Sequence, residues 1–421
     1  MIHRARSSSR RKVGSLFLVL AIAALAIAAF GAGTGSAKPT RALACGGVPN
    51  TPPNDPKNLL AKLKLSKALQ HDYTGWNQPI QASAWANWKP KHKPPYKVAI
   101  VWSAPSNSWN AYTFKLIQKF LKQSPLVNKN LIVTTASSQQ AVSEQVQQFN
   151  SAVQQGADII LNNPLSPTAL APAIESAGKQ GIPVVSAINS VDSPYAVSVS
   201  PNTYLDASFA ADAMVKALGG KGNVLEVLGV PGTSTVLDEQ KAWRSIFDGC
   251  PDIKLIGEIP AFYSVALAKT GVLQFLSTHT QPIDGVIQTA TMSQGVLAAF
   301  QQAGRPVPFI ADIAAQKGFM AYWNDNAAKG YKSFASVGGA TSSADLMTKT
   351  ILRILAGQGP KINQLIWRHP TANAKTIKSY VKAGWTADTI GTVENPKSTW
   401  WTDRDLDKFF NHPDRKKGTR Y

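Results

Sequence analysis

The chain has 421 residues, of which 44% are hydrophobic and 9% aromatic, so it can form two folded domains and is too apolar to be generally disordered. Its formal net charge of +20 at pH 7 raises the question of a nucleic-acid or anionic partner. The excess is spread out, with concentrations only at 89–97 and 415–420, and no basic helix with interleaved aromatic residues occurs. We therefore expect a basic, solvated exterior and no nucleic-acid partner.

The first 37 residues have the layout of an export signal. Five basic residues and no acidic residue precede position 13, residues 13–36 carry no charge, and the small residues Gly35 and Ala37 follow the apolar run. This order is typical of an export signal, and we expect cleavage after Ala37. An uncleaved segment of this length would instead anchor the protein in the membrane. Either way, the remaining chain is expected to be periplasmic or at the cell surface, and Arg10-Arg11 leaves both general and twin-arginine export open.

The next segment, 38–96, is rich in Pro, Asn, Lys and Trp, and we interpret it as an N-terminal leader with one predicted helix at 57–70. After it, apolar runs alternate with segments of helical spacing. The predicted strands are 98–102, 131–135, 158–161, 183–186, 223–228, 253–259, 285–288 and 309–311, and the predicted helices are 111–123, 141–155, 168–180, 204–218, 238–248, 265–277 and 293–303.

Strands that are apolar on consecutive positions are buried on both faces, which is typical of a parallel sheet covered by helices. The alternation pauses near residue 200 and then resumes. The chain is therefore expected to be an α/β protein with two doubly wound parallel-sheet lobes. The segment 366–421 is a C-terminal extension in which aromatic residues stand among charged ones. The sequence assigns no chemistry to it.

The chain has two cysteines, Cys45 and Cys250. An oxidising compartment permits a disulfide between them, which would tether the start of the leader to the second half of the chain. Alternatively, Cys45 in Ala-Leu-Ala-Cys-Gly would be a lipid attachment site. The disulfide is favoured, because Cys45 lies well beyond the apolar run.

Motifs of catalysis and of cofactor binding do not occur. The sequence has no Gly-x-x-x-x-Gly-Lys-Ser/Thr phosphate loop and no Gly-x-Ser-x-Gly elbow. Its six histidines are scattered, with none at the spacing of metal ligands. We expect no catalytic residue, no metal site and no cofactor, and hence a protein that is not an enzyme.

Polar and aromatic residues gather directly after the predicted strands. The carboxyl ends of parallel strands meet at one edge of a sheet, where open α/β sheets bind ligands. Aromatic faces stack on the C–H faces of a polyol, while amides and carboxylates pair with its hydroxyls. In any single loop a plain turn is the more common explanation of these residues, but their recurrence at one sheet edge favours a ligand site. The segments are 103–110, 162–166, 186–190, 232–234, 260–263 and 288–291, followed by Asp312.

Several segments, in order, carry a family resemblance: Gly-Ala-Asp-Ile-Ile-Leu-Asn-Asn-Pro at 156–164, Gln-Gly-Ile-Pro-Val-Val at 180–185, Cys-Pro-Asp-Ile-Lys at 250–254, Ile-Asp-Gly-Val at 283–286 and Gly-Val-Leu-Ala-Ala-Phe at 295–300. With them, residues 97–366 resemble the ribose-binding protein family, the type I periplasmic binding proteins of sugar transporters. The resemblance implies a type I periplasmic-binding-protein fold, whose two lobes are joined by a hinge with crossings near 199–202, 337–340 and 365–367. The N-terminal lobe would comprise 97–200 plus 340–365, including a helix at 342–356, and the C-terminal lobe 201–339.

The resemblance also implies ligand contacts. Asn107 and Trp109 match a ligand-contacting Asn and a stacking aromatic residue of the family, and Asn110 in the same loop joins the predicted set. Tyr263 matches the aromatic residue of the opposite lobe. Asp312 matches a carboxylate that takes sugar hydroxyls.

At other family positions the chain departs from the pattern. Ile188-Asn189 stands where an Asp-Arg pair is usual, Glu239 where Arg is usual, Thr289-Ala290 where Asn-Asp is usual, and Gly339 where Gln is usual. Asn189, Glu239 and Thr289 stay in the predicted ligand-binding set. Without the charged clamp, a less hydroxylated or a larger ligand is indicated in place of an ordinary pentose or hexose.

The expected function is that of an exported solute-binding protein, which captures a small sugar-like ligand by hinge closure and presents it to the membrane permease of an ABC-type importer. The alternative is a sensing module that presents the bound ligand to a membrane receptor kinase. Fold-level analogy does not separate the two.

Overall fold

A computed structural model of the chain describes residues 45–397 and 399–413. These residues belong to one compact unit, Leu43–Tyr421. The predicted export signal at 1–37 lies outside the described residues. Within the described part of the chain, no helix is long and apolar enough to cross a membrane.

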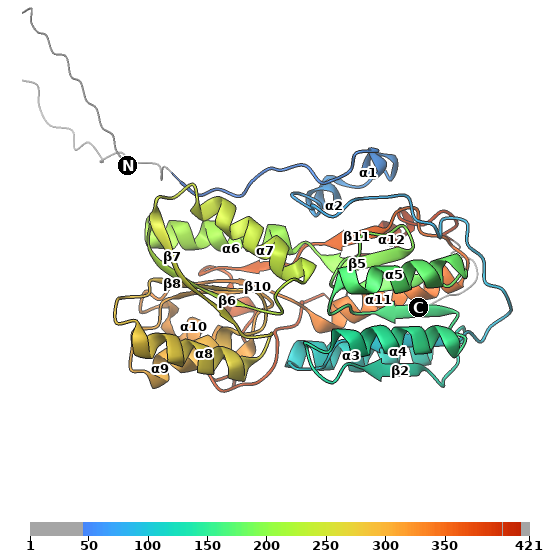
Figure 1. The fold of residues 1–421 in the computed structure, drawn as a ribbon. Helices are drawn as coiled ribbons and strands as arrows, with labels where there is room; N and C mark the ends of the chain where they lie inside the picture. The colour runs from blue at the N-terminus through green and yellow to red at the C-terminus, as the bar shows by residue number, and fades with distance from the viewer. Residues whose placement is uncertain (1–44, 398, 414–421) are drawn as a thin grey trace, which may run out of the picture. The chain divides into compact units, whose positions relative to one another are not determined.

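The first lobe is built on a six-stranded sheet with the order β11-β5-β4-β3-β1-β2, in which every pair of neighbours is parallel. Helices α3 and α11 pack together on one face of this sheet, and α4 and α5 cover the other (Figure 1). The strands are β1 (Val98–Trp102), β2 (Ile132–Thr135), β3 (Ile159–Asn162), β4 (Val184–Ala187), β5 (Ala196–Pro201) and β11 (Gln364–Trp367). The helices are α3 (Ser108–Gln123), α4 (Val142–Gln154), α5 (Pro167–Lys179) and α11 (Ala340–Leu355).

The second lobe repeats this plan with the strand order β12-β10-β9-β8-β6-β7, in which only β12 is antiparallel to its neighbour. Helices α6 and α7 pack on one face and α8 and α9 on the other. The strands are β6 (Lys221–Leu228), β7 (Asp252–Pro260), β8 (Gly285–Gln288), β9 (Phe309–Asp312), β10 (Phe334–Ser336) and β12 (Thr371–Ala372). The helices are α6 (Thr203–Leu218), α7 (Ser234–Phe247), α8 (Val265–Thr278), α9 (Ser293–Gln302) and α10 (Lys317–Ala327). The predicted pair of doubly wound lobes is confirmed.

The chain passes between the lobes at three places, from β5 to α6, from β10 to α11 and from β11 to β12. The boundary predicted at 365–366 falls inside β11, because this strand continues to Trp367 and pairs with β5 throughout. The segment after it is part of both lobes. Phe409 and Phe410 are fully buried in the core of the first lobe, and the backbone N–H of Val393 donates to the carbonyl of Ala315 in the second lobe.

The helix predicted at 57–70 is wrong as a single element. The structure has two short helices, α1 (Leu59–Lys62) and α2 (Lys67–His71). Lys64 has a φ of 51°, a left-handed conformation that ends a right-handed helix. Ser66 then caps α2, because its hydroxyl accepts a hydrogen bond from the backbone N–H of Leu69.

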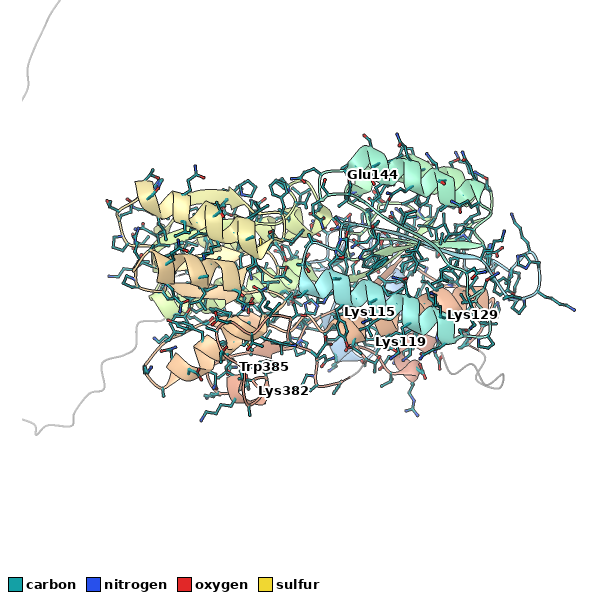
Figure 2. The ribbon with its side chains drawn as sticks, turned by 90° about the horizontal axis from the view of Figure 1, so that it is seen from below. Lys115, Lys119, Lys129, Glu144, Lys382 and Trp385 are labelled. Atoms are coloured by element: carbon teal, nitrogen blue, oxygen red, sulfur yellow. A yellow bond between two sulfur atoms is a disulfide. The ribbon has the colours of Figure 1, made fainter. Side chains whose placement is uncertain are left out.

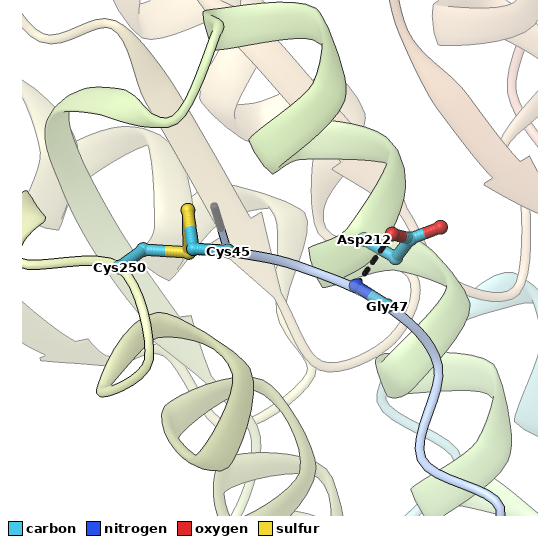
Figure 3. The surroundings of a disulfide bond; sticks show 4 residues. All are labelled: Cys45, Gly47, Asp212 and Cys250. Carbon is cyan, nitrogen blue, oxygen red and sulfur yellow. Dashed lines mark hydrogen bonds between the residues drawn. A yellow bond between two sulfur atoms is a disulfide. The ribbon is translucent and has the colours of Figure 1, made fainter. Parts of the chain in front are cut away.

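The leader contacts both lobes. Cys45 is disulfide-bonded to Cys250 of the second lobe, and the N–H of Gly47 donates to the carboxylate of Asp212 at 2.9 Å (Figure 3). Further along, the hydroxyl of Tyr73 donates to the carbonyl of Gln364 in the first lobe at 2.8 Å. With its thiol in a disulfide, Cys45 is not free to carry a lipid.

Exposed lysines lie on helix α3 and just after it. Lys115 and Lys119 project from α3, and Lys129 follows it (Figure 2). Lys115 and Lys119 are solvated, as expected for a basic exterior, whereas the ammonium group of Lys129 donates to the backbone carbonyls of Lys122 and Ser124.

Candidate ligand-binding site between the lobes

A cavity lies between the two lobes, at the carboxyl ends of their strands, and residues of both lobes and of the crossings line it. This is the place where open parallel sheets bind ligands. Six of the eight predicted contact residues line this cavity: Asn107, Trp109, Asn110, Asn189, Glu239 and Tyr263.

On the first lobe, the loop after β1 is held by the start of α3. The side-chain oxygen of Asn107 accepts a hydrogen bond from the N–H of Asn110 at 2.9 Å, which makes Asn107 the N-cap of α3. This cap starts the helix three residues earlier than the sequence pattern predicts. The amide of Asn110 is itself bound on both sides, because its nitrogen donates to Ser103 at 2.9 Å and its oxygen accepts from the indole of Trp102 at 2.6 Å.

The half-buried Trp109 presents the aromatic face of the first lobe. Its indole N–H donates to the carbonyl of Gly338 at 3.2 Å, so the ring is fixed against the second crossing between the lobes. Fixed rings suit stacking on the C–H face of a polyol.

Asn189 lies where the lobes touch. Its side-chain nitrogen donates to the carbonyl of Pro164 within the first lobe, and its oxygen accepts from the hydroxyl of Thr235 in the second lobe, both at 2.8 Å. The preceding residue, Ile188, has a φ of 65°. A β-branched residue in this region is strained, and such strain is typical of positions held for a function.

On the second lobe, Glu239 of α7 is fully buried, and both of its carboxylate oxygens lack a hydrogen-bond partner among the described residues. Burial raises the pKa of Glu239 well above its ordinary value, and the negative charges of Asp206 and Asp238 raise it further. Burial and the charge of Glu239 also raise the pKa of Tyr263. The Tyr263 ring lies so close to Gly229 that a Cβ there would be 2.1 Å from it, which requires glycine at that position.

The other two predicted contacts, Thr289 and Asp312, do not line the cavity. The hydroxyl of Thr289 accepts from the N–H of Gly229 at 2.7 Å, and the carboxylate of Asp312 accepts from the N–H of Gln316 at 2.8 Å. Both residues are fully buried, and burial raises the pKa of Asp312 to about 7. They are scaffold residues at the ends of β8 and β9. The wall is formed there by the residues that follow them in the chain: Ala290, Thr291, Ile313 and Ala314.

The fold can be compared with known proteins. Residues 98–361 match the family described as periplasmic binding protein domain. The chain belongs to the periplasmic binding protein family.

Curated relatives of this periplasmic binding protein are named for sugars and polyols. The xylitol-binding protein of Mycolicibacterium smegmatis is 30% identical over 184 residues, which cover 43% of this chain and 53% of that protein. The galactofuranose-binding protein YtfQ of Escherichia coli is 30% identical over 139 residues, covering 32% and 44% respectively. The chain thus spans about half the length of these two relatives.

Solved structures agree with the two-lobed architecture. An ABC transporter solute binding protein from Thermobispora bispora aligns with a TM-score of 0.63 and 26% identity, covering 74% of this chain and 94% of that one. One from Mycobacterium smegmatis with bound glycerol aligns with a TM-score of 0.61 and 17% identity, covering 70% and 100%. At the latter identity the likeness shows the fold alone.

The cavity of this periplasmic binding protein also contains residues that sequence reasoning missed. Asp206, in the first turn of α6, pairs with His369 just after β11, and their carboxylate oxygen and ring nitrogen are 2.6 Å apart. Trp367 lines the cavity and stacks on Trp400 of the C-terminal segment, with ring centroids 6.0 Å apart. Asp206 could have been found, because it is an acid in the first helical turn after a predicted crossing.

Proposed function

We propose that this protein captures a small polyhydroxylated ligand outside the cytoplasm by closure of its two lobes, and that it presents the ligand to the permease of an ABC importer. The observation that carries the proposal is the cavity itself, to which each lobe contributes an aromatic ring and polar side chains. A ligand that contacts both lobes stabilises the closed arrangement over the open one.

The proposed ligand class is inferred from the side chains of the cavity wall and from the names of the relatives. Trp109 and Tyr263 offer ring faces, while Asn189 and Glu239 offer polar atoms for hydroxyl groups. The printed names of the relatives specify xylitol, galactofuranose and ribose. These relatives are binding proteins, which supports a role in binding for this chain and none in catalysis.

The proposed location is outside the cytoplasm, with the segment 1–37 either cleaved or retained as an anchor. The disulfide between Cys45 and Cys250 supports it, because disulfides persist in oxidising compartments.

A thermal-shift screen of the secreted form tests the proposal. The panel contains xylitol, myo-inositol, D-ribose, L-arabinose, D-galactose, D-glucosamine and 1-amino-1-deoxysorbitol, with amino acids and purines as compounds outside the class. A ligand at one hundred times its Kd stabilises the native state by about 2.7 kcal/mol, which gives a clear rise in melting temperature. A rise with a polyol or sugar supports the proposal. A rise only with amino acids or purines, or no rise at all, contradicts it.

A further inference from the structure

Glu239 is a charged residue of the cavity wall whose side chain is left without a partner. It is 0% exposed, it lines the cavity, and neither of its carboxylate oxygens has a hydrogen-bond partner among the described residues. A buried carboxylate without a partner is costly to the folded protein. An orphaned buried polar group in a ligand cavity therefore indicates that the ligand supplies the partner.

The wall around Glu239 carries an excess of acid. Asp206, also 0% exposed, lines the same cavity, and one of its oxygens is 2.6 Å from a ring nitrogen of His369, while the other has no hydrogen-bond partner. Among the described lining residues there is no lysine and no arginine. His369 can therefore compensate one carboxylate at most, which leaves the other without a counter-charge.

Cations behind the wall act on other acids: burial raises the pKa of Asp238, and the positive charge of Lys241 lowers it. Asp238, next to Glu239 on α7, accepts a hydrogen bond from the side chain of Asn77 at 2.7 Å and adds negative charge. Asp72 lies 3.8 Å from Arg368, whose side chain is 39% exposed. Arg368 thus faces Asp72 and solvent, and it does not line the cavity.

We propose that the ligand carries an amine, which Glu239 binds as an ammonium group, so that the ligand class is that of amino sugars and aminated polyols. This inference rests on the proposed function and narrows its ligand class. An ammonium group brings three donors and one positive charge, which match two acceptor oxygens and an uncompensated negative charge. A neutral hydroxyl brings one donor and no charge, so it can pair with Glu239 only as the protonated acid, whereas an ammonium group can also compensate the ionised carboxylate.

Binding of an amine should release a proton from Glu239. Burial, Asp206 and Asp238 raise the pKa of Glu239 in the empty cavity, which favours the protonated acid there. An ammonium group favours the carboxylate, so its binding transfers the proton of Glu239 to solvent. The affinity for an amine should consequently rise with pH, up to the point where the amine itself loses its charge.

Calorimetric titration of the full exported protein with matched pairs tests the inference. Each pair differs by one amine in place of one hydroxyl: 1-amino-1-deoxysorbitol with sorbitol, and D-glucosamine with D-glucose. N-acetyl-D-glucosamine, in which an uncharged amide replaces the amine, is a second neutral comparison for D-glucosamine. We expect the amine to bind at least about ten-fold more tightly than its neutral twins, and the preference for 1-amino-1-deoxysorbitol to be larger at pH 8 than at pH 5.5.

Two variants show whether Glu239 is the residue responsible. Glu239→Gln should reduce the preference to near parity, whereas Asp238→Asn, which removes an adjacent buried carboxyl that does not line the cavity, should retain most of it. The ratio of affinities for the amine and for its neutral analogue in the wild-type protein tests the inference even if a variant fails to fold. Equal or tighter binding of the neutral twins overturns the inference and leaves the proposed function standing. An equal preference in Glu239→Gln and wild type also overturns it, and binding of no compound in either series counts against both.

Discussion

The hydroxyl of Thr235 in the second lobe donates a hydrogen bond of 2.8 Å to the side-chain oxygen of Asn189 in the first lobe. Both residues are buried and line the cavity. The bond therefore joins the lobes directly, at the place where a ligand would also bridge them. It supports the lobe contact independently of any ligand.

Removing this bond should favour the open arrangement. Thr235→Val keeps the shape of the side chain but loses the donor, and a hydrogen bond of this kind is worth about 1 kcal/mol. We expect ligand affinity to fall roughly five-fold and the radius of gyration of the ligand-free protein to increase in small-angle scattering. Thr278→Val, on the exposed end of α8, is the matched control. Unchanged scattering and affinity in Thr235→Val would show that the bond does not bias closure.

Trp109 provides a second prediction. Trp109→Ala removes the ring that is fixed against Gly338, and the lost stacking should weaken ligand binding by about 0.5–1.5 kcal/mol. Tyr112→Ala, on the same helix but 45% exposed and outside the cavity wall, should leave the affinity unchanged. Calorimetry on both variants measures the difference, and equal affinities would remove Trp109 from the site.

The stability of the protein should depend on pH through Asp312. Its pKa is raised to about 7 by burial, so the folded state holds a proton that the unfolded state loses near pH 4. Stability is then fully present below pH 4 and decreases as the pH rises to about 7, by a few kcal/mol for this group. Urea denaturation between pH 4 and 8 should show a smaller decrease in Asp312→Asn than in wild type. The exposed Asp325 gives the control variant Asp325→Asn, and identical slopes in all three proteins would contradict the assignment.

The disulfide between Cys45 and Cys250 should stabilise the fold. The bridge spans a sequence separation of 205 residues, and the loss of loop entropy in the unfolded chain corresponds to up to about 5 kcal/mol. Cys45→Ser/Cys250→Ser should lower the free energy of unfolding by about 2–5 kcal/mol in urea. A reducing agent should reproduce the loss in wild type and have no effect on the variant. Equal stability with and without the bridge would show that the leader is held by its other contacts.

The C-terminal segment should be needed for folding of the first lobe. Phe410 is fully buried in the core of that lobe, so Phe410→Ala should cost about 3–5 kcal/mol. Ile390, in the same segment, is 81% exposed, and Ile390→Ala should cost little. Chemical denaturation of the two variants compares them, and similar values would contradict an integral role of this segment.

The two lobes could be predicted because their central strands are apolar on consecutive positions. β5 escaped prediction, since its sequence Ala-Val-Ser-Val-Ser-Pro alternates with serine and resembles a half-exposed segment. All of it is buried, and the serine hydroxyls are satisfied internally: Ser198 accepts from the N–H of Val191, and Ser200 pairs with Ser190. Side-chain partners 7 and 10 positions away in the chain do not show in the alternation of a six-residue segment.

Site residues in loops that follow a strand could be predicted from the sequence. Whether a given side chain points into the cavity could not. Asp312 is at the expected strand end, but its carboxylate is taken by the N–H of Gln316 at the start of α10. His369 reaches the cavity only because the chain returns after β11 and brings it to Asp206, which is 163 positions away in the sequence. A single sequence does not contain that pairing.

The most direct test of ligand capture between the lobes is a crystal structure of the exported protein with the compound that gives the largest thermal shift. One ligand molecule in the cavity, in contact with Trp109 from the first lobe and Glu239 from the second, is the predicted result. A ligand bound elsewhere, or one held by a single lobe, would contradict the account.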